Sequence, residues 1–505
     1  MSLRPPTGQQ WGWERRALVL LLITGWWLRI CPISDNRLHA DEAWYSYWGL
    51  LIGRGIDPWL THVPLDKPPL LPYLLALSEW LAGRAGGWPG DGLAVRLPGL
   101  ITGLLSIPLT AALASSLYRS SRVMLLAALG VALSPLAILF SATAFTDPPM
   151  VASGLAACVA AARGRPGWAG LWCGLACAAK QSGVLWLPLA ALIWVVQEKH
   201  NLTWRKFGRM LIALAVVTGI IGAWDVARVA QGAVSFWQAG IQGYGGLRLI
   251  WPQELSTRLY RWLVLMRYIF VSPVVNTLLL AGLPALVSRA LCAPRSSEAG
   301  LYTREALADI SLTCFALLYF LFLWLRAFQV WDRYVLPLMP LLAILLGRIL
   351  SVLGADRIPL LIILLLLILM SQPAWNAAHS LYPIGGDHGA YDGIDVIAAF
   401  LRSQPEGTVV YHHWLGWHYS FYLFGAPLYL AYWPTPAWLA QDVRAFGAQG
   451  GRFIAFPSWE SSARVEHALT RAGYKLVPVL ATTRRDGTRS FTLYRLQPLS
   501  ERGIR

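Results

Sequence analysis

Eleven apolar runs, separated by short polar connections, occupy residues 17–370 and constrain the fold more than any other feature of the chain. A helix of about 20 residues crosses the hydrocarbon core of a bilayer. Hydrophobic residues make up 56% of the chain and charged residues only 13%, whereas a soluble chain carries roughly 25% charged residues. The sequence therefore predicts a polytopic α-helical membrane protein and excludes disordered, collagen-like and small disulfide-rich chains. The runs are 17–30, 93–117, 123–140, 149–162, 168–178, 184–196, 210–226, 273–287, 306–325, 335–350 and 359–370.

Several of these runs are shorter than a full span, so about eleven transmembrane helices is the expected number. The pair 168–178 and 184–196 forms either two spans or one broken span. The first run follows Arg15 and Arg16, as in a signal peptide, but no small-residue cleavage site follows it. We therefore expect a retained helix there.

The net charge of +16 is distributed unevenly along the chain. Basic residues gather in alternate connections, which is the positive-inside pattern of membrane proteins. This pattern puts 31–92, 227–272 and 371–505 on the outer side of the membrane. No nucleic-acid-binding motif accompanies the charge, so anionic membrane lipid is its expected partner and nucleic acid is not. The basic residues of the expected cytoplasmic connections include Arg119, Arg122, Arg163, Arg165, Arg205, Lys206 and Arg209.

The composition becomes more polar at about residue 371. Short helical and strand patterns then alternate, which predicts a small soluble α/β domain over 371–505 beside a membrane domain over 1–370. His412, His413 and His418 are interpreted as loop histidines, because no carboxylate or cysteine accompanies them. The expected helices are 396–401, 442–446 and 463–472, and the expected strands are 408–411, 453–456, 476–480 and 491–496.

The long outer segment 31–92 opens on an acidic pair, Asp41-Glu42, followed by the aromatic residues Trp44 and Tyr45. In one interpretation, Asp41 caps an interfacial helix and Glu42 complements its dipole. In the other, a carboxylate at the membrane surface takes a proton from an attacking hydroxyl. The residues alone leave both interpretations open.

Four further motifs put charged side chains on the same predicted face of the membrane. Carboxylates beside prolines are also common helix caps, and a lone lysine can snorkel to the interface. Alternatively, the cations hold a phosphate, for which the arginine fork is well suited. Acids, cations and aromatics on one face are the composition expected of a pocket for a sugar carried on a phosphate. The motifs are Asp66-Lys67-Pro68-Pro69, Thr146-Asp147-Pro148, Lys180-Gln181 and Asp332-Arg333-Tyr334.

The order of these motifs resembles the bacterial branch of the protein O-mannosyltransferase superfamily, which also contains the lipid A aminoarabinose transferases. The resemblance covers roughly residues 15–350. It implies the multi-span C-type glycosyltransferase fold, a polyprenyl-phosphate sugar as donor, and inversion of the anomeric centre. It also implies roles at ten positions. These are acceptor activation by Asp41 with Glu42 in support, binding of the donor phosphate by Lys67, Lys180, Arg333 and Tyr334, and pocket lining by Asp66, Asp147, Trp44 and Tyr45.

One position departs from the pattern. The aminoarabinose transferases carry Arg three residues after the catalytic Asp, where this chain has Trp44. The departure argues against aminoarabinose or lipid A as substrate. Some relatives use a divalent metal ion, which His39, His62, Asp66 and Glu42 could ligate, but their spacing leaves the metal open.

The sequence thus predicts an integral membrane glycosyltransferase of the bacterial plasma membrane, with its active site and C-terminal domain outside the cytoplasm. Its partners would be a polyprenyl-phosphate sugar and an acceptor that is a glycan, a lipid or a protein. A flippase for lipid-linked sugars is the alternative, against which the absence of an inverted repeat argues. An inert sugar-lipid-binding scaffold is the third possibility.

Overall fold

The computed structural model describes residues 11–84, 92–198, 203–243, 248–292, 303–353 and 359–499. The chain forms two compact units. The first consists of Met1–Asp35, Arg54–Leu75 and Arg96–Gly385. The second consists of Asn36–Gly53, Ala76–Val95 and Gly386–Arg505. Composition predicted a division at residue 370. In the structure, the unit that contains the C-terminal region also includes Asn36–Gly53 and Ala76–Val95, which come mostly from the predicted outer loop 31–92.

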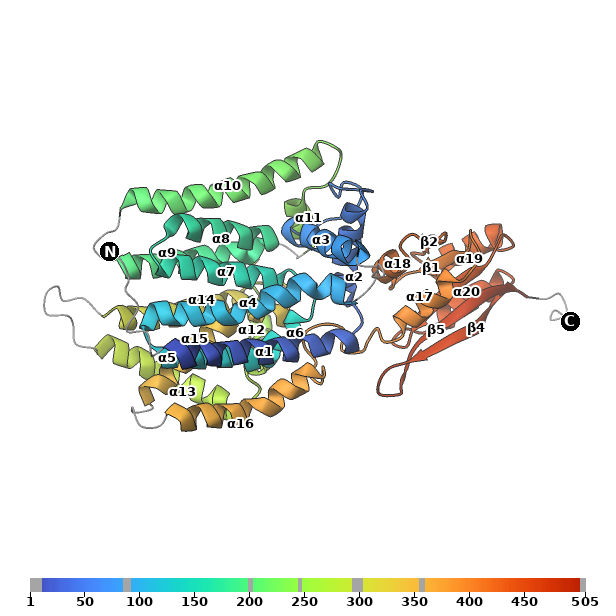
Figure 1. The fold of residues 1–505 in the computed structure, drawn as a ribbon. Helices are drawn as coiled ribbons and strands as arrows, with labels where there is room; N and C mark the ends of the chain where they lie inside the picture. Colours follow the sequence, from blue (N-terminus) through green and yellow to red (C-terminus); the bar gives the residue numbers. More distant parts are fainter. Residues whose placement is uncertain are drawn as a thin grey trace. The chain divides into compact units, whose positions relative to one another are not determined.

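Six helices among the described residues are long and apolar enough to cross a membrane, and the bent pair α5–α6 adds a seventh candidate. The predicted polytopic helical fold is confirmed, and each of the eleven apolar runs falls on a helix or a helix pair (Figure 1). The number of eleven spans stays a prediction. The six are α1 (Trp11–Asp35), α4 (Gly92–Tyr118), α10 (Trp204–Val229), α13 (Pro273–Cys292), α14 (Arg304–Leu325) and α16 (Pro359–Ala378). The other helices of the apolar runs are α5 (Ser121–Leu133), α6 (Pro135–Ser141), α7 (Asp147–Ala162), α8 (Pro166–Ala179), α9 (Trp186–Glu198) and α15 (Leu338–Leu353).

The segments predicted to lie on the outer side also contain helices. The pattern of apolar residues did not distinguish these helices from loops, so they were not predicted from the sequence. They are α2 (Ala40–Gly53), α3 (Leu70–Arg84), α11 (Phe236–Gly243) and α12 (Leu255–Met266). Four short 3-10 helices complete the set: η1 (Gln181–Leu185), η2 (Pro252–Glu254), η3 (Arg267–Ile269) and η4 (Asp332–Val335).

A fully buried arginine lies at the bend of 59° between α5 and α6. Pro135 opens α6 and has no N–H to donate, so carbonyls at the end of α5 lose their helical partners. Arg29 of α1 donates to two of them, those of Val131 at 2.8 Å and Ala132 at 3.1 Å. Its Nε donates to the Ser141 hydroxyl at 3.1 Å. A buried helix break requires such a donor, because no water reaches these carbonyls in a bilayer.

Helices α8 and α10 pack closely through two glycines spaced one turn apart. A Cβ on Gly170 would lie 1.9 Å from the Met210 carbonyl oxygen, and one on Gly174 would lie 2.5 Å from the Val217 Cβ. Small residues at this spacing let helix backbones approach in a membrane. This contact holds α8 against α10 and so fixes the position of Lys180, which follows the carboxyl end of α8.

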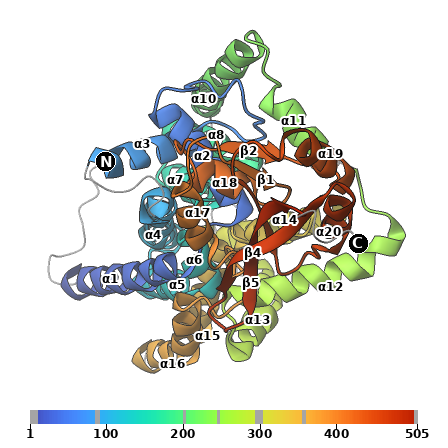
Figure 2. The ribbon, with the colours of Figure 1, turned by 90° about the vertical axis from the view of Figure 1, so that its right-hand side faces the viewer.

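The second unit contains a five-stranded sheet of order β2-β1-β3-β5-β4. Strands β1, β2 and β3 are parallel, whereas β5 is antiparallel to both β3 and β4. Strands β4 and β5 lie side by side in both views (Figure 1, Figure 2). The strands are β1 (Val409–His412), β2 (Tyr429–Tyr432), β3 (Arg452–Pro457), β4 (Tyr474–Thr483) and β5 (Arg489–Pro498).

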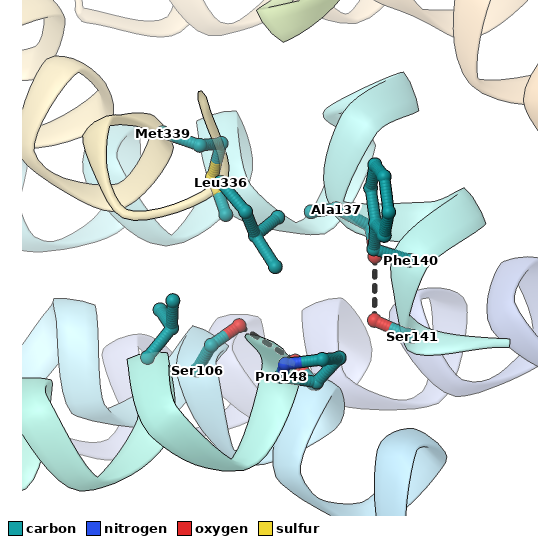
Figure 3. A pocket seen from close by; sticks show the side chains of 9 residues that line it. Ser106, Ala137, Phe140, Ser141, Pro148, Leu336 and Met339 are labelled. Carbon is teal, nitrogen blue, oxygen red and sulfur yellow. Dashed lines mark hydrogen bonds between the residues drawn. The ribbon is translucent and has the colours of Figure 1, made fainter. Parts of the chain in front are cut away.

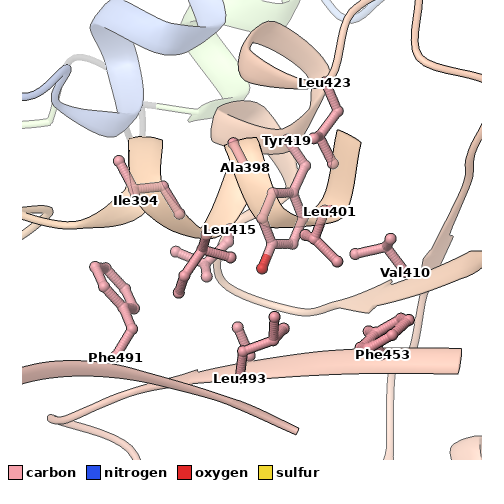
Figure 4. Packing of buried hydrophobic residues seen from close by; sticks show 12 residues of the cluster. Ile394, Ala398, Leu401, Val410, Leu415, Tyr419, Leu423, Phe453, Phe491 and Leu493 are labelled. Atoms are coloured by element: carbon pink, nitrogen blue, oxygen red, sulfur yellow. The ribbon is translucent and has the colours of Figure 1, made fainter. Parts of the chain in front are cut away.

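Helices cover both faces of this sheet, because adjacent strand residues alternate between two apolar cores. Val410 and Phe453 face α17 (Ile394–Arg402) and α18 (Gly416–Tyr422) (Figure 4). Their neighbours Tyr411 and Ile454 belong to the opposite core. That core also contains residues of α19 (Pro436–Phe446) and α20 (Ala463–Arg471). The predicted α/β domain is confirmed.

Helix α2 belongs to this unit and packs on α18. The Trp44 ring stacks on the Trp417 ring, with centroids 4.8 Å apart and planes at 20°. It also contacts Trp48 at 4.8 Å, and Tyr45 is buried against Trp48 at 5.2 Å. Burial of aromatic rings contributes strongly to stability, and these contacts hold α2 against the α/β domain.

Candidate active site

Five charged side chains of the first unit, here called the charged cluster, come from four separate segments. Lys67 precedes α3, Asp147 opens α7, Lys180 ends α8 and Arg333 lies in η4. The fifth, Asp66, forms an ion pair with Lys67. The cluster thus contains the charged residues of the four sequence motifs except Asp332.

Lys180 connects three of these segments. Its Nζ lies 2.7 Å from the Asp147 Oδ1 in a buried ion pair and 4.4 Å from the centre of the Tyr334 ring. The charges of Arg333 and Lys67 also act on it. Arg333 lies against the same Tyr334 ring, and Gln181, the residue after Lys180, donates to the Asp66 carbonyl. Ionisable groups held in this way where little water reaches are functional candidates.

Arg333 is 7% exposed and lies among aromatic rings. Its Cζ is 4.9 Å from the centre of the Phe145 ring, 5.5 Å from that of Trp331 and 6.0 Å from that of Tyr334. Cation–π attraction to these rings helps to hold the guanidinium in place. Arg333 thus brings a positive charge into a mostly apolar surrounding, where charges act strongly on one another.

Hydrogen bonds to backbone fix the segments that bear these charges. The Tyr319 hydroxyl donates to the Tyr334 carbonyl at 3.0 Å, and the Gly385 N–H donates to Asp332 Oδ2 at 2.8 Å. The Gln181 amide donates to the Asp66 carbonyl at 2.7 Å. Both η4 and the segment before α3 are therefore held in one position before any ligand binds, which lowers the cost of ordering them.

Arg228 of α10 anchors the chain leading to Asp66. Its guanidinium donates to the carbonyls of Trp59 at 2.9 Å and Leu60 at 2.7 Å. The Asp225 carboxylate, 3.0 Å away, balances its charge. Leu60 has φ of 54° and lies in the left-handed region, so this turn needs outside support.

Asp41 and Glu42 lie in the second unit, at the start of α2. Glu42 is fully buried and accepts a hydrogen bond from the His39 N–H at 2.9 Å. The Ala43 N–H donates to the His39 carbonyl. His39 is therefore the N-cap: its Nδ1 accepts from the Asp41 N–H at 3.2 Å, and the Glu42 carboxylate satisfies the His39 N–H. Asp41 lies in the same first turn, where the helix dipole favours a carboxylate.

A small cavity of about 10 Å³ lies beside the start of α7, where Pro148 is one of its lining residues. Figure 3 shows Leu336 and Met339 opposite Pro148 and Ser106. Its lining is almost entirely apolar, and the Ser106 hydroxyl is already used within its own helix. This space suits at most one water molecule and is too small for a sugar.

The residues considered for a metal ion have other partners within their own units. Within the described ranges, no group of three or more His, Cys, Asp or Glu side chains could hold one. His39 and Glu42 belong to the second unit, and His62 and Asp66 to the first. Glu42 caps α2, and Asp66 pairs with Lys67.

Sequence reasoning missed the aromatic residues that support the charges. Phe145 and Trp331 each stand two residues before a predicted charged residue, and that proximity was the only sign in the sequence that they belong to the site.

No sequence motif indicated a role for Tyr391 of the second unit. Its ring contacts His39 and His418, with centroids 6.3 and 4.1 Å away, and its pKa is raised by burial and by the carboxylates of Asp387 and Asp41.

Part of the chain matches a known protein family. The family model "Dolichyl-phosphate-mannose-protein mannosyltransferase" matches residues 66–224. That range contains Asp66, Lys67, Asp147 and Lys180. No curated protein matches the chain by sequence.

Three solved structures share the fold. ArnT from Cupriavidus metallidurans bound to undecaprenyl phosphate is 16% identical with a TM-score of 0.62, over 96% of this chain and 98% of that one. Its apo form gives a TM-score of 0.61 at the same identity and coverage. Arabinofuranosyltransferase AftD from Mycobacteria is 14% identical with a TM-score of 0.52, over 97% of this chain and 40% of that one.

These matches confirm the resemblance indicated by the order of the motifs and the C-type fold that it implied. By its family match and by its fold, the chain is a membrane protein related to glycosyltransferases that take their sugar from a lipid-phosphate-linked donor.

Proposed function

We propose that this chain is an inverting glycosyltransferase that moves a sugar from a polyprenyl-phosphate donor to an acceptor hydroxyl on the outer face of the membrane. The observation that carries the proposal is the buried charged cluster around Lys180. It occurs in a chain that shares its fold with a protein bound to undecaprenyl phosphate.

The donor phosphate is assigned to the first unit. Lys67, Lys180 and Arg333 supply positive charge, and Tyr334 lies against Lys180. A phosphate that leaves from an anomeric carbon gains negative charge at its bridging oxygen. Preorganised cations stabilise that developing charge in a site of low dielectric constant.

Acceptor activation is assigned to the second unit. The Asp41 carboxylate takes the proton of the acceptor hydroxyl, and the hydroxyl oxygen bonds to the anomeric carbon from the face opposite the phosphate. The bond between that carbon and the phosphate oxygen breaks, and polyprenyl phosphate leaves with the electron pair. One displacement inverts the anomeric centre.

The remaining assignments complete the proposal. Asp66, Asp147, Trp44 and Tyr45 line or support the pocket, and Glu42 holds the helix that bears Asp41. Positive-inside asymmetry supports an extracytoplasmic active site and C-terminal domain in a bacterial plasma membrane. The acceptor is a glycan, a lipid or a protein of the cell envelope, and Trp44 argues against lipid A.

The test uses the purified full chain in detergent with a radiolabelled polyprenyl-phosphate sugar and a panel of acceptors. Wild type is expected to release free polyprenyl phosphate, and Asp41→Asn to lose this release almost completely while remaining folded. Asp486→Asn is the matched control, because Asp486 is an exposed turn residue of the same unit.

Two outcomes contradict the proposal. Wild-type release by Asp41→Asn removes Asp41 as the base. If the glycosidic bond of the donor stays intact with every acceptor of the panel, the chain is not a glycosyltransferase. Transport of the intact donor across a vesicle membrane then identifies a flippase, and binding without transport identifies a scaffold.

A further inference from the structure

Four aromatic side chains of the second unit, here called the Tyr391 cluster, gather from four segments of the chain. The Tyr391 ring lies 4.1 Å from the His418 ring, 5.7 Å from the Trp459 ring and 6.3 Å from the His39 ring, measured between centroids. His418 and Trp459 come from the α/β domain, and His39 is the N-cap of α2. The cluster therefore connects the α/β domain to the helix that bears Asp41.

The cluster lies where α/β sheets commonly bind ligands. Strand β1 is central: β2, the next strand in sequence, pairs with one edge of β1, and β3 pairs with its other edge. The chain therefore reverses its direction across the sheet, and the topological switch point lies between β1 and β3. Ligands of open α/β sheets bind outside the carboxyl ends of the strands at such a point. Trp459 follows the end of β3 by two residues, and His418 lies in α18, the first helix after β1.

Trp459 has the properties of a stacking residue. It is 45% exposed, yet its position is fixed, because it packs edge-on against Tyr391 at 86° and against Phe491 at 70°. Figure 4 shows Phe491 as part of the packed core. A rigid, half-exposed indole binds at a low cost in conformational entropy.

The surroundings of Trp459 are polar. Its neighbours Ser458 and Glu460 are exposed, and Arg484 donates to the Ser458 hydroxyl at 2.7 Å. One aromatic face among hydroxyl, carboxylate and guanidinium groups matches a sugar ring, whose C–H face packs on an indole and whose hydroxyls need donors and acceptors. An acyl chain would need a continuous apolar surface instead.

Tyr391 connects this face to the reaction. The His39 ring lies 6.3 Å from the Tyr391 ring, and its Nδ1 accepts a hydrogen bond from the Asp41 N–H at 3.2 Å, so His39 joins Tyr391 to the turn that bears Asp41. A sugar stacked on Trp459 would therefore have its hydroxyls on the side of the cluster that leads to Asp41.

We propose that Trp459 and Tyr391 form the acceptor-binding site, and that the acceptor is a carbohydrate. This inference rests on the proposed function, since it names the acceptor class of the same reaction. Trp459 stacks on the acceptor sugar, and Tyr391 positions the sugar beside Asp41.

The test measures binding and turnover separately on the full chain in detergent. Saturation-transfer NMR with a panel of methyl glycosides (hexosides, pentosides and N-acetylhexosaminides) reports binding without turnover. Wild type is expected to bind at least one glycoside, and Trp459→Ala to bind it at least ten-fold more weakly. Trp438→Ala is the matched control, because Trp438 is 39% exposed in the same unit and lies in α19.

Turnover provides the second measurement. With the best glycoside as acceptor, Trp459→Ala is expected to raise the acceptor KM at least ten-fold, whereas the control Trp438→Ala is expected to keep the KM of wild type. Trp459→Phe is expected to recover part of the loss, because it keeps an aromatic face. Unchanged thermal unfolding of each variant shows that folding is intact.

The failures of the two proposals are distinguishable. Equal glycoside binding and equal KM in Trp459→Ala and wild type overturn the acceptor site while donor cleavage persists. Transfer to a lipid or peptide with no glycoside binding by wild type also overturns it. Absence of donor cleavage in wild type overturns the proposed function and, with it, this assignment.

Discussion

The Lys180 Nζ lies 2.7 Å from the Asp147 Oδ1, and both side chains are buried. This pair joins the carboxyl end of α8 to the amino end of α7. Lys180→Met alone would leave a buried carboxylate without its partner, which costs roughly 3–5 kcal/mol of stability. The structural and functional roles of Lys180 must therefore be separated.

The double variant Lys180→Met/Asp147→Asn separates them. Its thermal unfolding is expected to lie closer to wild type than that of Lys180→Met, because no charge remains unpaired. Its release of polyprenyl phosphate is expected to stay about 100-fold below wild type, since a stabilising cation is missing. Lys206→Met, which breaks the more exposed Lys206–Glu198 pair, serves as control. Recovery of activity together with stability would show that Lys180 acts only structurally.

The close approach of α8 and α10 gives a second prediction. Gly170→Ala places a methyl group against the Met210 carbonyl oxygen and is expected to lower stability by about 1–3 kcal/mol. Gly219→Ala, on α10 with nothing within 4 Å of its Cβ, is expected to be neutral or to stabilise by up to about 1 kcal/mol. Thermal unfolding of both variants in one detergent measures the difference. Equal midpoints would mean that the two helices do not pack through Gly170.

Arg29 gives a third prediction. Arg29→Met removes the donor from the Val131 and Ala132 carbonyls, and each orphaned buried group costs about 1–3 kcal/mol. The unfolding temperature is therefore expected to fall well below that of Arg205→Met, whose side chain is exposed on α10. An equal, small effect of both substitutions would show that the bend at Pro135 does not depend on Arg29.

The sequence located the apolar helices because hydrophobic composition alone determines where a bilayer can accept a segment. It did not divide 123–140 into two helices, although Pro135 stands in the middle of that run. The carbonyls at the break are satisfied by Arg29, more than 100 residues away in sequence, and no local pattern indicates such a partner. Pairing between distant segments is the part of this fold that composition leaves open.

The α/β domain shows the same limit. All strands except β2 were predicted: β1, β3 and β5 are largely buried and apolar, and the apolar run 476–480 indicated β4, although only one of its side chains is buried. Strand β2 was missed because it is an edge strand whose side chains are mostly exposed. Helix α18 was also missed, since its seven residues are largely aromatic and polar. Both depend on contacts that only the assembled sheet provides.

For the candidate site, short motifs beside prolines identified the charged cluster, because a helix start fixes the place of a carboxylate. The Tyr391 cluster had no such motif. His418 was interpreted as a loop residue, whereas it lies in α18 with no exposed surface. Tyr391 and Trp459 are nearly 70 residues apart, and only the fold brings them together.

Buried histidines give a prediction for the pH dependence of the second unit. His418 donates from Nε2 to the Leu38 carbonyl at 2.9 Å, and burial lowers its pKa to about 4. Burial likewise lowers the pKa of His412 to about 4, with the charge of His413 adding to the effect. Both side chains are therefore neutral in the folded chain at pH 6, whereas an unfolded histidine titrates at about 6.5.

The sign of the effect follows from proton binding. Between pH 6.5 and about 4 the unfolded chain binds protons that the folded chain does not, so stability falls as the pH falls through this window. The loss for His418 is on the order of 3 kcal/mol when it is complete. Hydrogen exchange of the α18 amides in the full chain, measured at pH 7 and pH 5, is expected to show reduced protection at the lower pH.

His418→Gln tests whether this histidine causes the loss. The glutamine amide can still donate to the Leu38 carbonyl but does not titrate, so part of the pH dependence is expected to disappear. His467→Gln, an exposed position on α20, is expected to behave as wild type. If His418→Gln loses protection between pH 7 and pH 5 as steeply as wild type, the loss arises elsewhere, because a residue that cannot bind a proton cannot contribute to it.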